Sequence, residues 1–248
     1  MKQFWRFAGM LLVSVLCLQL FFAARIALMT VVSPQSTTFQ RSEALRLLRE
    51  KHQILWAQQW VDGSLISKHL KRAVIASEDA GFNEHGGVDW DALEKAWDKN
   101  QRAQELADQR AARLAKTNPN KPAPVPKVIG GSTISQQLAK NLFLNSERNL
   151  LRKGQELVLT LMLEALLDKQ RILEIYLNNV EWGEGVFGAQ AAARHYYRVD
   201  AARLGPNQAA RLAVMLPAPK RFEKRPGSPY VIGRAGTIEA RMGAVDIP

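Results

Sequence analysis

The stretch that decides the fold class runs Leu150-Leu-Arg-Lys-Gly-Gln-Glu-Leu-Val-Leu-Thr-Leu-Met-Leu-Glu-Ala-Leu-Leu-Asp168. Its apolar residues fall on almost every side of a helix, a pattern that outside a membrane is typical of a buried central helix. The polar residues recur at every fourth position and therefore share one stripe: Arg152, Glu156, Thr160 and Glu164. An ordinary ion pair between Arg152 and Glu156 would explain part of this stripe. A glutamate on so apolar a helix is also expected to be desolvated, which makes the stripe a candidate site.

Further helices follow from the same period on both sides of this stretch. We expect them over residues 42–60, 66–76, 88–97, from 133 onward, and over 169–178, 189–197, 207–216 and 233–242. No segment of useful length alternates apolar and polar residues as a strand does. The sequence therefore predicts an all-α domain.

Residues 98–127 break this pattern. The segment is poor in apolar residues, carries more basic than acidic residues, and contains a proline cluster that a regular helix does not accommodate: Pro119, Pro122, Pro124 and Pro126. We predict a mobile inserted loop, for which a solvated linker is the plainest interpretation.

The composition limits the partners. A chain of 248 residues has room for one domain of ordinary size and an appendage. Its 34 Lys and Arg against 23 Asp and Glu give a formal charge of +11, which indicates nucleic acid, a lipid headgroup surface or a phosphorylated substrate. Nucleic acid is the weakest of these, because no tract interleaves basic and aromatic residues and no recognition motif is present. The single cysteine, Cys17, excludes an internal disulfide.

The amino terminus predicts a membrane anchor. Lys2 and Arg6 precede an apolar run over residues 7–24 that only Ser14 and Gln19 interrupt, and this length is about the minimum for a spanning helix. Positive charge ahead of the run favours a cytoplasmic amino terminus. The alternatives are a buried core helix and a cleaved signal peptide, for which the run is long. We expect an uncleaved single-pass anchor over residues 1–32 and an exported domain over residues 33–248.

A second candidate site lies in residues 77–87, where adjacent carboxylates, an aromatic ring, a histidine and a glycine pair occur together. Glu78 and Asp79 are neighbours, so a helix would direct them to different sides. Phe82 beside a carboxylate could raise its pKa toward neutrality, as a general acid or base requires. Taken alone, the segment is explained more simply by an acidic helix end with a glycine stop.

A third candidate follows at residues 130–141, where two glycines precede a helix that Ser132 or Thr133 would cap. Thr133, Gln136, Gln137 and Lys140 would then share one polar face. Such a face suits an anion or a sugar. An ordinary amphipathic helix with a solvated side accounts for it equally well.

These blocks, in this order, resemble the monofunctional peptidoglycan glycosyltransferases, which share their catalytic domain with bifunctional penicillin-binding proteins. With x for any residue, the matching blocks are Glu78-Asp79-x-x-Phe82-x-x-His85-x-Gly87, Gly130-x-Ser132-Thr133-x-x-Gln136-Gln137-x-x-Lys140-Asn141, Arg152-Lys153-x-x-Glu156 and Lys169-x-x-Ile172-Leu173-Glu174-x-Tyr176-Leu177-Asn178. Similar blocks follow around Gly185 and at Leu216-Pro217-x-Pro219. The family's first two blocks usually lie closer together, so much of segment 98–127 is expected to be an insertion.

The resemblance implies a lysozyme-like helical glycosyltransferase domain with a smaller membrane-proximal lobe, preceded by one transmembrane helix. It implies that the protein polymerises lipid II into β-1,4-linked glycan strands of the cell wall. A sugar hydroxyl of lipid II would attack the anomeric carbon of the growing lipid-linked glycan, invert that carbon and release undecaprenyl pyrophosphate. The enzyme would be anchored in the cell inner membrane with its catalytic domain in the periplasm.

The resemblance also implies roles for residues. Glu78 matches the general base. Glu156 matches a second essential glutamate near the donor's pyrophosphate, where it is the candidate ligand of a divalent cation, Mg²⁺ or Mn²⁺; the sequence does not decide whether the reaction needs that cation. Lys140, Arg148 and Arg152 match clamps for the pyrophosphate. The other matched residues are expected to bind and position the substrate or the motif backbone: Asp79, Phe82, His85, Thr133, Gln136, Gln137 and Asn141.

The expected partners are lipid II, the growing lipid-linked glycan, the membrane, and transpeptidases or other cell-wall synthesis proteins, since the chain carries no second domain for cross-linking. No nucleic acid is expected. A lysozyme-like hydrolase or lytic transglycosylase is one alternative, because it also uses a glutamate in an all-α domain, but it has no need of clamps for a pyrophosphate. A non-catalytic membrane scaffold is another, but it would be free to lose Glu78 and Glu156.

Overall fold

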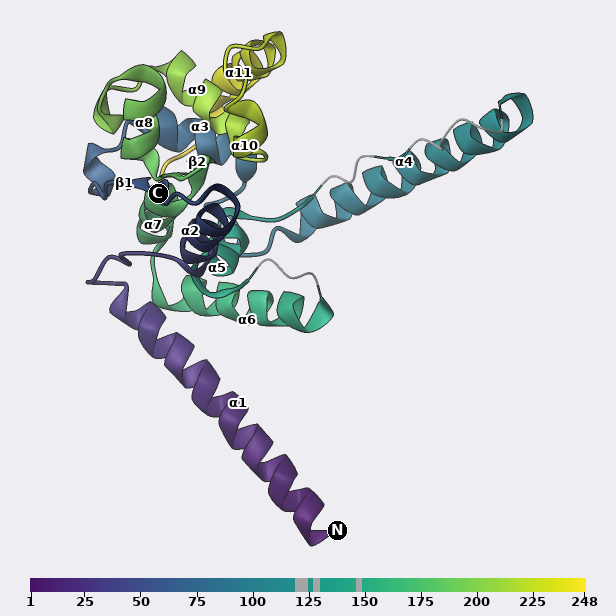
Figure 1. The fold of residues 1–248 in the computed structure, drawn as a ribbon, viewed down its shortest axis with the longest axis vertical. Coiled ribbons are helices and arrows are strands. Elements are labelled where there is room, and N and C mark those ends of the chain that lie inside the picture. Colours follow the sequence, from purple (N-terminus) through teal and green to yellow (C-terminus); the bar gives the residue numbers. More distant parts are fainter. Residues whose placement is uncertain (119–124, 127–129, 146–148) are drawn as a thin grey trace.

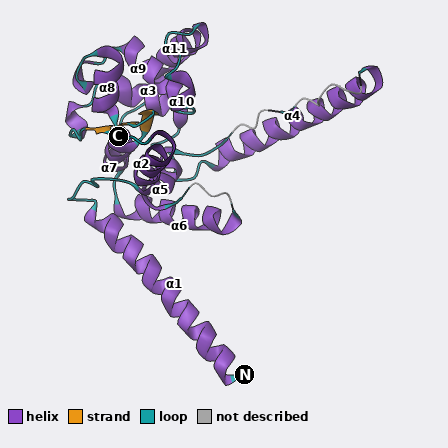
Figure 2. Ribbon diagram, viewed as in Figure 1, coloured by secondary structure: helices purple, strands orange, loops and turns teal. Residues whose placement is uncertain are grey.

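The computed structural model describes residues 1–118, 125–126, 130–145 and 149–248. Helices dominate these residues, which confirms the all-α prediction (Figure 2). Two long helices leave the body of the domain in different directions: α1 (Lys2–Leu28) and α4 (Trp90–Thr117) (Figure 1). Most of the shorter helices gather in the body, which holds the candidate site.

The centre of the body is α7 (Lys169–Asn179), whose residues Ile172, Ile175, Tyr176 and Leu177 are all fully buried. Burying a large apolar side chain stabilises a fold by roughly 1.5–3 kcal/mol. Around α7 lie α5 (Ile134–Phe143), α6 (Leu150–Leu166) and α8 (Ala189–Tyr197). A second group packs together from α3 (Lys68–Glu78), α9 (Pro206–Met215) and α11 (Pro229–Arg241), while α2 (Thr38–Lys51) lies on α5. The remaining helical turns are η1 (Gly63–Leu65), η2 (Ala201–Arg203), α10 (Pro219–Phe222) and η3 (Met242–Ala244).

The prediction that residues 150–168 form the buried central helix is wrong. The helix forms as α6, but it buries only one face, which consists of Glu156, Leu159, Thr160 and Leu163. Its other faces expose large apolar residues: Leu150, Leu151, Leu157, Val158, Leu161 and Leu166. An all-round apolar pattern states only that a helix avoids water. A helix packed in protein on every side has this pattern, and so does a helix that faces protein on one side and lipid on the other.

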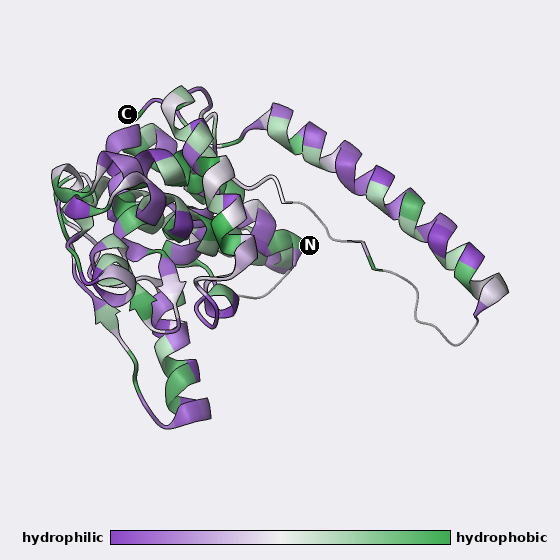
Figure 3. Cartoon of the chain, turned by 90° about the horizontal axis from the view of Figure 1, so that it is seen from above, coloured by the Kyte–Doolittle hydropathy of each residue, from purple (hydrophilic) through white to green (hydrophobic). Residues whose placement is uncertain are grey.

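The prediction that segment 98–127 lacks regular structure is wrong for residues 98–117, which continue α4 instead of ending a helix at 97. The segment is rich in Ala, Gln, Arg and Glu, which are good helix formers even where few apolar residues need burial. Figure 3 shows α4 extending away from the body with hydrophilic residues along most of its length. Pro119, Pro122 and Pro124 lie outside the described residues, and the mobility of the segment stays a prediction.

Three short strands occur among the described residues, where the sequence predicts none: β1 (Ala57–Gln58), β2 (Glu181–Gly183) and β3 (Val186–Phe187). They form one sheet in the order β1-β3-β2, with β1 parallel and β2 antiparallel to β3. Strands of two or three residues are too short to show a period of two. Because residues 57–58 pair in this sheet, the helix predicted over 42–60 ends at Lys51, followed by His52 in the left-handed conformation (φ 54°).

Among the described residues, α1 is the one helix long and apolar enough to cross a membrane. Most of its apolar side chains are exposed, including Phe4, Trp5, Leu11 and Leu12. Its last turns differ, because Ile26 and the following Met29 are buried against the body. These features agree with a membrane anchor that joins the domain directly.

Gly188 occupies a backbone position that does not accommodate a side chain. It precedes α8 with φ +82°, and a Cβ there would lie 2.5 Å from the carbonyl oxygen of Asn178. The side chain of Asn178 exchanges hydrogen bonds with the backbone of Val61, at 2.9 and 3.0 Å. Asn178 therefore cannot shift without breaking the link between α7 and the segment after β1.

We expect Gly188→Ala to lower the free energy of unfolding by roughly 2–3 kcal/mol, because the new Cβ combines a left-handed conformation with a steric clash. The measurement is the thermal unfolding midpoint of the full-length protein in detergent. Gly236→Ala in α11 is the matched control, since a Cβ there meets nothing within 4 Å. It should be neutral or stabilising by up to about 1 kcal/mol. Equal midpoints for the two variants would contradict the steric argument.

Candidate active site

Glu78 forms the last residue of α3 and lies beside the first turns of α5. Gln137 donates a hydrogen bond from Nε2 to Glu78 Oε2 at 3.0 Å, and the hydroxyl of Tyr176 in α7 donates to Gln137 Oε1 at 3.0 Å. Burial raises the pKa of Glu78 above its ordinary value, and the hydrogen bond from Gln137 opposes this shift only in part. A carboxylate with a raised pKa accepts a proton more readily than an ordinary glutamate does.

Asp79 is buried, and both of its carboxylate oxygens are engaged. Oδ1 lies 2.8 Å from His85 Nε2, and Oδ2 accepts the backbone N–H of Ile134 at 2.9 Å. The backbone N–H of Gly87 donates to His85 Nδ1 at 3.1 Å. His85 must therefore carry a hydrogen on Nε2 and donate it to Asp79. This network ties the end of α3, the loop over residues 79–87 and the start of α5 into one unit.

The loop also rests against α6. Gly87 has φ +93°, and a Cβ there would lie 2.8 and 2.9 Å from side-chain carbons of α6, so only glycine permits this approach. Lys169 of α7 donates from Nζ to the carbonyl oxygen of His85 at 2.7 Å and to Glu164 Oε1 at 2.9 Å. The same ammonium lies 4.5 Å from the ring centroid of Phe82, which is fully buried. Phe82 thus supports the loop from within the core.

Thr133 caps α5. Its Oγ1 accepts the backbone N–H of Gln136 at 3.1 Å, and Gln136 Oε1 accepts the backbone N–H of Thr133 at 3.1 Å. The hydroxyl of Thr133 also donates to the carbonyl oxygen of Gly87 at 2.6 Å. These bonds occupy Thr133 and the amide oxygen of Gln136, so Gln137 and Lys140 are left as the principal polar groups of this helix face.

The first turns of α6 hold a buried carboxylate between two cations. Glu156 is only 4% exposed, and it accepts hydrogen bonds from Arg152 Nη1 at 3.0 Å and from Lys153 Nζ at 2.5 Å. Lys140 of α5 adds a third positive group. Burial lowers the pKa of Lys140, and attraction to Glu156 counteracts that shift. We refer to Lys140, Arg152, Lys153 and Glu156 as the cation cluster.

Two cavities adjoin along the start of α5. One, of about 330 Å³, opens over the cation cluster and is lined also by Gln137 and Asn141. The other, of about 300 Å³, holds Glu78, with Lys95 and Lys99 of α4 on its wall. Ser132 lines both cavities. Gln137 faces the cation cluster and bonds Glu78, so the two cavities form adjoining halves of one candidate active site.

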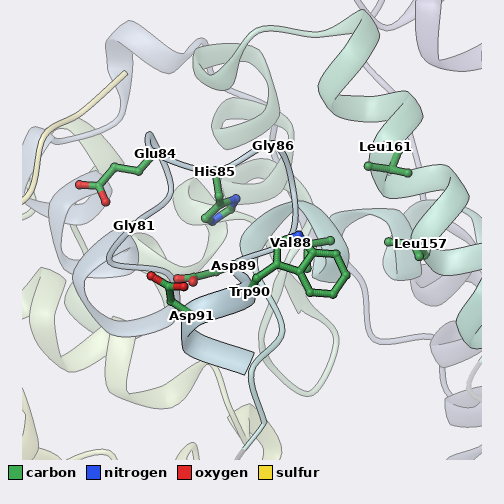
Figure 4. A pocket seen from close by; sticks show the side chains of 10 residues that line it. All are labelled: Gly81, Glu84, His85, Gly86, Val88, Asp89, Trp90, Asp91, Leu157 and Leu161. Atoms are coloured by element: carbon green, nitrogen blue, oxygen red, sulfur yellow. The ribbon is translucent and has the colours of Figure 1, made fainter. Parts of the chain in front are cut away.

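A larger cavity of about 580 Å³ lies beside the same loop (Figure 4). Its wall combines acidic residues with an apolar side made by Trp90, Leu157 and Leu161. Neither Glu78 nor the cation cluster lines it. Size alone would favour this cavity, but Glu78 and the cation cluster line the two smaller cavities, and we therefore place the candidate site there.

The described residues do not form a ready metal site. Asp79, His85 and Asp89 lie close enough together to hold an ion, but both oxygens of Asp79 and both ring nitrogens of His85 already have partners. Glu156 likewise has both oxygens in ion pairs. Mg²⁺ at a phosphate site is usually held by one or two carboxylates together with phosphate oxygens and water, but the one carboxylate of the cation cluster is already paired with two basic side chains.

The structure gathers most of the predicted site residues at these cavities or directly behind them. Arg148 lies outside the described residues. The sequence analysis missed Lys95 and Lys99, which line the cavity that holds Glu78. Their spacing of four positions, soon after the first block, places both on one side of a helix and could have indicated them. Lys153 was also missed as a second ion-pair partner of Glu156.

A helical domain that sets a desolvated glutamate beside a cation cluster is suited to acid–base chemistry on an anionic substrate. A family model described as Transglycosylase matches residues 50–243. The biosynthetic peptidoglycan transglycosylases of Burkholderia lata and Burkholderia orbicola are each 50% identical to this chain over 233 residues, which cover 94% of this chain and 86% of theirs. That of Burkholderia pseudomallei is 49% identical over 94% of this chain and 83% of its own. The chain belongs to the peptidoglycan transglycosylase family, which confirms the resemblance and makes it a glycosyltransferase of cell-wall glycan synthesis.

We expect Asp79→Asn to destabilise the protein by about 1–3 kcal/mol, because the new amide nitrogen faces either the His85 or the Ile134 N–H and leaves a buried donor unpaired. Chemical unfolding of the full-length protein in detergent measures this. Glu84→Gln, on the exposed part of the same loop, is the control and should change stability by no more than about 0.5 kcal/mol. Equal stability of the two variants would refute the role of Asp79 as a structural tie.

Proposed function

We propose that this transglycosylase polymerises lipid II in the cleft between α3, α5 and α6, with Glu78 as general base and the cation cluster as the group that binds the donor's pyrophosphate. One observation carries the proposal. Gln137 holds the Glu78 carboxylate and at the same time lines the cavity of the cation cluster. A proton acceptor and an anion-binding group thus lie one side chain apart, as glycosyl transfer from a pyrophosphate donor requires.

In the proposed reaction the acceptor is the 4-hydroxyl of the N-acetylglucosamine of lipid II. Its oxygen bonds to the anomeric carbon of the lipid-linked glycan as its proton passes to Glu78. The bond from that carbon to the pyrophosphate oxygen breaks, and the electron pair leaves with undecaprenyl pyrophosphate. Attack opposite the leaving group inverts the carbon and yields a β-1,4 bond. The raised pKa of Glu78 makes it a better proton acceptor than an ordinary glutamate.

The cation cluster would stabilise the charge that develops on the leaving group. Preorganised donors in a site that excludes water contribute about 3–4 kcal/mol each in well-studied enzymes. Arg152 and Lys153 are held by the carboxylate of Glu156 before any substrate binds. The contribution of Glu156 is then to orient these cations. The role of Arg148 as a further clamp stays a prediction.

We propose that the reaction needs no divalent cation at Glu156. Both oxygens of that carboxylate are occupied by ion pairs, and three basic side chains already offer positive charge to a pyrophosphate. The described residues therefore fit direct neutralisation by basic side chains better than a metal bridge.

We further propose that α1 crosses the inner membrane with its amino terminus in the cytoplasm and the domain in the periplasm. Lys2 and Arg6 precede the apolar run, which favours this orientation. The exposed apolar residues of α6 lie on a helix that contacts α1. A lipid-linked substrate could then reach the cation cluster from the bilayer, and the net charge of +11 favours an anionic membrane surface.

We expect Glu78→Gln to reduce polymerisation of lipid II by at least about 100-fold, because an amide cannot accept the proton. The assay separates labelled glycan on a gel after incubation of the full-length protein with lipid II, and the unfolding midpoint shows that the fold is intact. Glu84→Gln is the matched control and should retain activity. Residual activity within tenfold of the unmodified protein would contradict the role of Glu78 as base. Glycan that shrinks and never grows would instead indicate a hydrolase.

We expect EDTA to lower the polymerisation rate of the unmodified protein by less than about twofold, since the basic side chains supply the charge that a metal would supply. The same gel assay, run with EDTA and then with Mg²⁺ or Mn²⁺ restored, measures the effect. A loss of tenfold or more that either metal reverses would show that a divalent cation takes part.

A further inference from the structure

The last turns of α1 are docked on the body. The ring of Phe22 packs against Phe143 of α5, with centroids 5.4 Å apart, and the guanidinium of Arg25 lies 5.2 Å from the Phe143 ring centroid. Ile26 is fully buried, and the carbonyl oxygen of Met29 accepts a hydrogen bond from Arg171 Nε at 2.8 Å. The anchor is therefore a packed element of the domain over this part of its length.

The docked part of α1 also carries a polar contact. Gln19 and Gln155 of α6 form a reciprocal amide pair, in which Gln19 Nε2 donates to Gln155 Oε1 at 2.9 Å and Gln155 Nε2 donates to Gln19 Oε1 at 3.0 Å. Gln19 lies nine positions before Leu28, the end of α1, which at 1.5 Å per residue is about 14 Å along the helix. Its neighbours Leu18 and Leu20 are exposed, so the amide is set in an apolar surface.

An amide at such a position has few other partners. Unpaired polar groups are costly in hydrocarbon, and polar residues in membrane-spanning helices are mostly found in contacts with other helices. Among the described residues, the other side-chain hydrogen bonds of residues 149–160 stay within α6 and its cap. The amide pair is thus the side-chain hydrogen bond that links the first half of α6 to another element.

The same half of α6 carries part of the cation cluster. Gln155 directly precedes Glu156. Arg152 lies three positions before Gln155 and therefore on the same side of the helix as Gln155. Leu150 and Leu151 at the start of α6 are 90% and 89% exposed, so packing against the body does not fix this end. A slip of α6 along α1 would move Arg152 and Glu156 away from Lys140.

We propose that Gln19 is a positioning residue of the donor half of the site: its amide pair with Gln155 sets the register of α6 along the anchor and thereby places Arg152, Lys153 and Glu156. The inference rests on the proposed function of the cation cluster. It makes the membrane anchor part of the site's architecture. Gln19 itself lines neither cavity of the candidate site.

The first test measures binding of a polyprenyl pyrophosphate to the full-length protein in detergent micelles. Gln19→Leu and Gln155→Leu should each weaken binding by about 5–10-fold, and the double variant should be no worse than either single variant, because both remove the same contact. Ser14→Leu is the matched control, since the hydroxyl of Ser14 bonds only to the carbonyl oxygen of Met10 in its own helix. Equal binding by the Gln19→Leu and Ser14→Leu proteins, or a double variant whose loss is the product of the single losses, would overturn the proposal.

The second test is independent of substrate. In a Cys17→Ser background, Gln19→Cys with Gln155→Cys should be joined by a short bis-methanethiosulfonate cross-linker in detergent. The pair Ser14→Cys with Gln155→Cys, on another side of α1, should not. Absence of the 19–155 product would overturn the contact whatever the enzyme does. A product formed by a protein whose parent polymerises no lipid II would refute the proposed function and leave the contact standing.

Discussion

The site depends on the buried carboxylate of Asp79. One oxygen accepts the N–H of Ile134 at the first residue of α5, and the other accepts the hydrogen of His85. A polar group buried this deeply is tolerated only when its hydrogen bonds are made, so the end of α3 cannot leave the start of α5. Glu78 lies on the first of these helix ends, and Lys140 lies about two turns along the second. The spacing between the candidate base and the cations is therefore built into the junction of two helices.

The sequence was sufficient for the helical class and for the start of α5, because local caps and a 3.6-residue period are properties of short segments. It was misleading where distant parts of the chain decide the outcome. The apolar pattern of α6 indicates avoidance of water, but only the packed structure shows that α7 takes the centre and that Leu157 and Leu161 stay outside. The pairing of Ala57 with Val186 joins residues far apart in sequence, and no local pattern could predict it.

The candidate site shows the same contrast between what local sequence predicts and what distant contacts decide. Motif order predicted Glu78, Lys140 and Glu156 as site residues, since the spacing of blocks can be read directly from a sequence, and the structure places them at two adjoining cavities. The tasks of individual side chains depend on partners that spacing does not give. Gln136 lies on the predicted polar face, yet its amide oxygen caps the helix, while Lys95 enters the Glu78 cavity from α4. Membership of the family shows what class of reaction the chain performs.

The long helix α4 connects the wall of the Glu78 cavity to a point far from the body. It begins at its cap Asp89, carries Lys95 and Lys99 on the wall of the Glu78 cavity, and then leaves the body (Figure 1). Its 28 residues span about 42 Å at 1.5 Å per residue, and such a rod transmits force along its length. Evolution could lengthen or shorten it by whole turns at the far end without altering the spacing at the cleft. The same rod would act as a lever, because a load applied near Thr117 would be felt at the lysines beside Glu78.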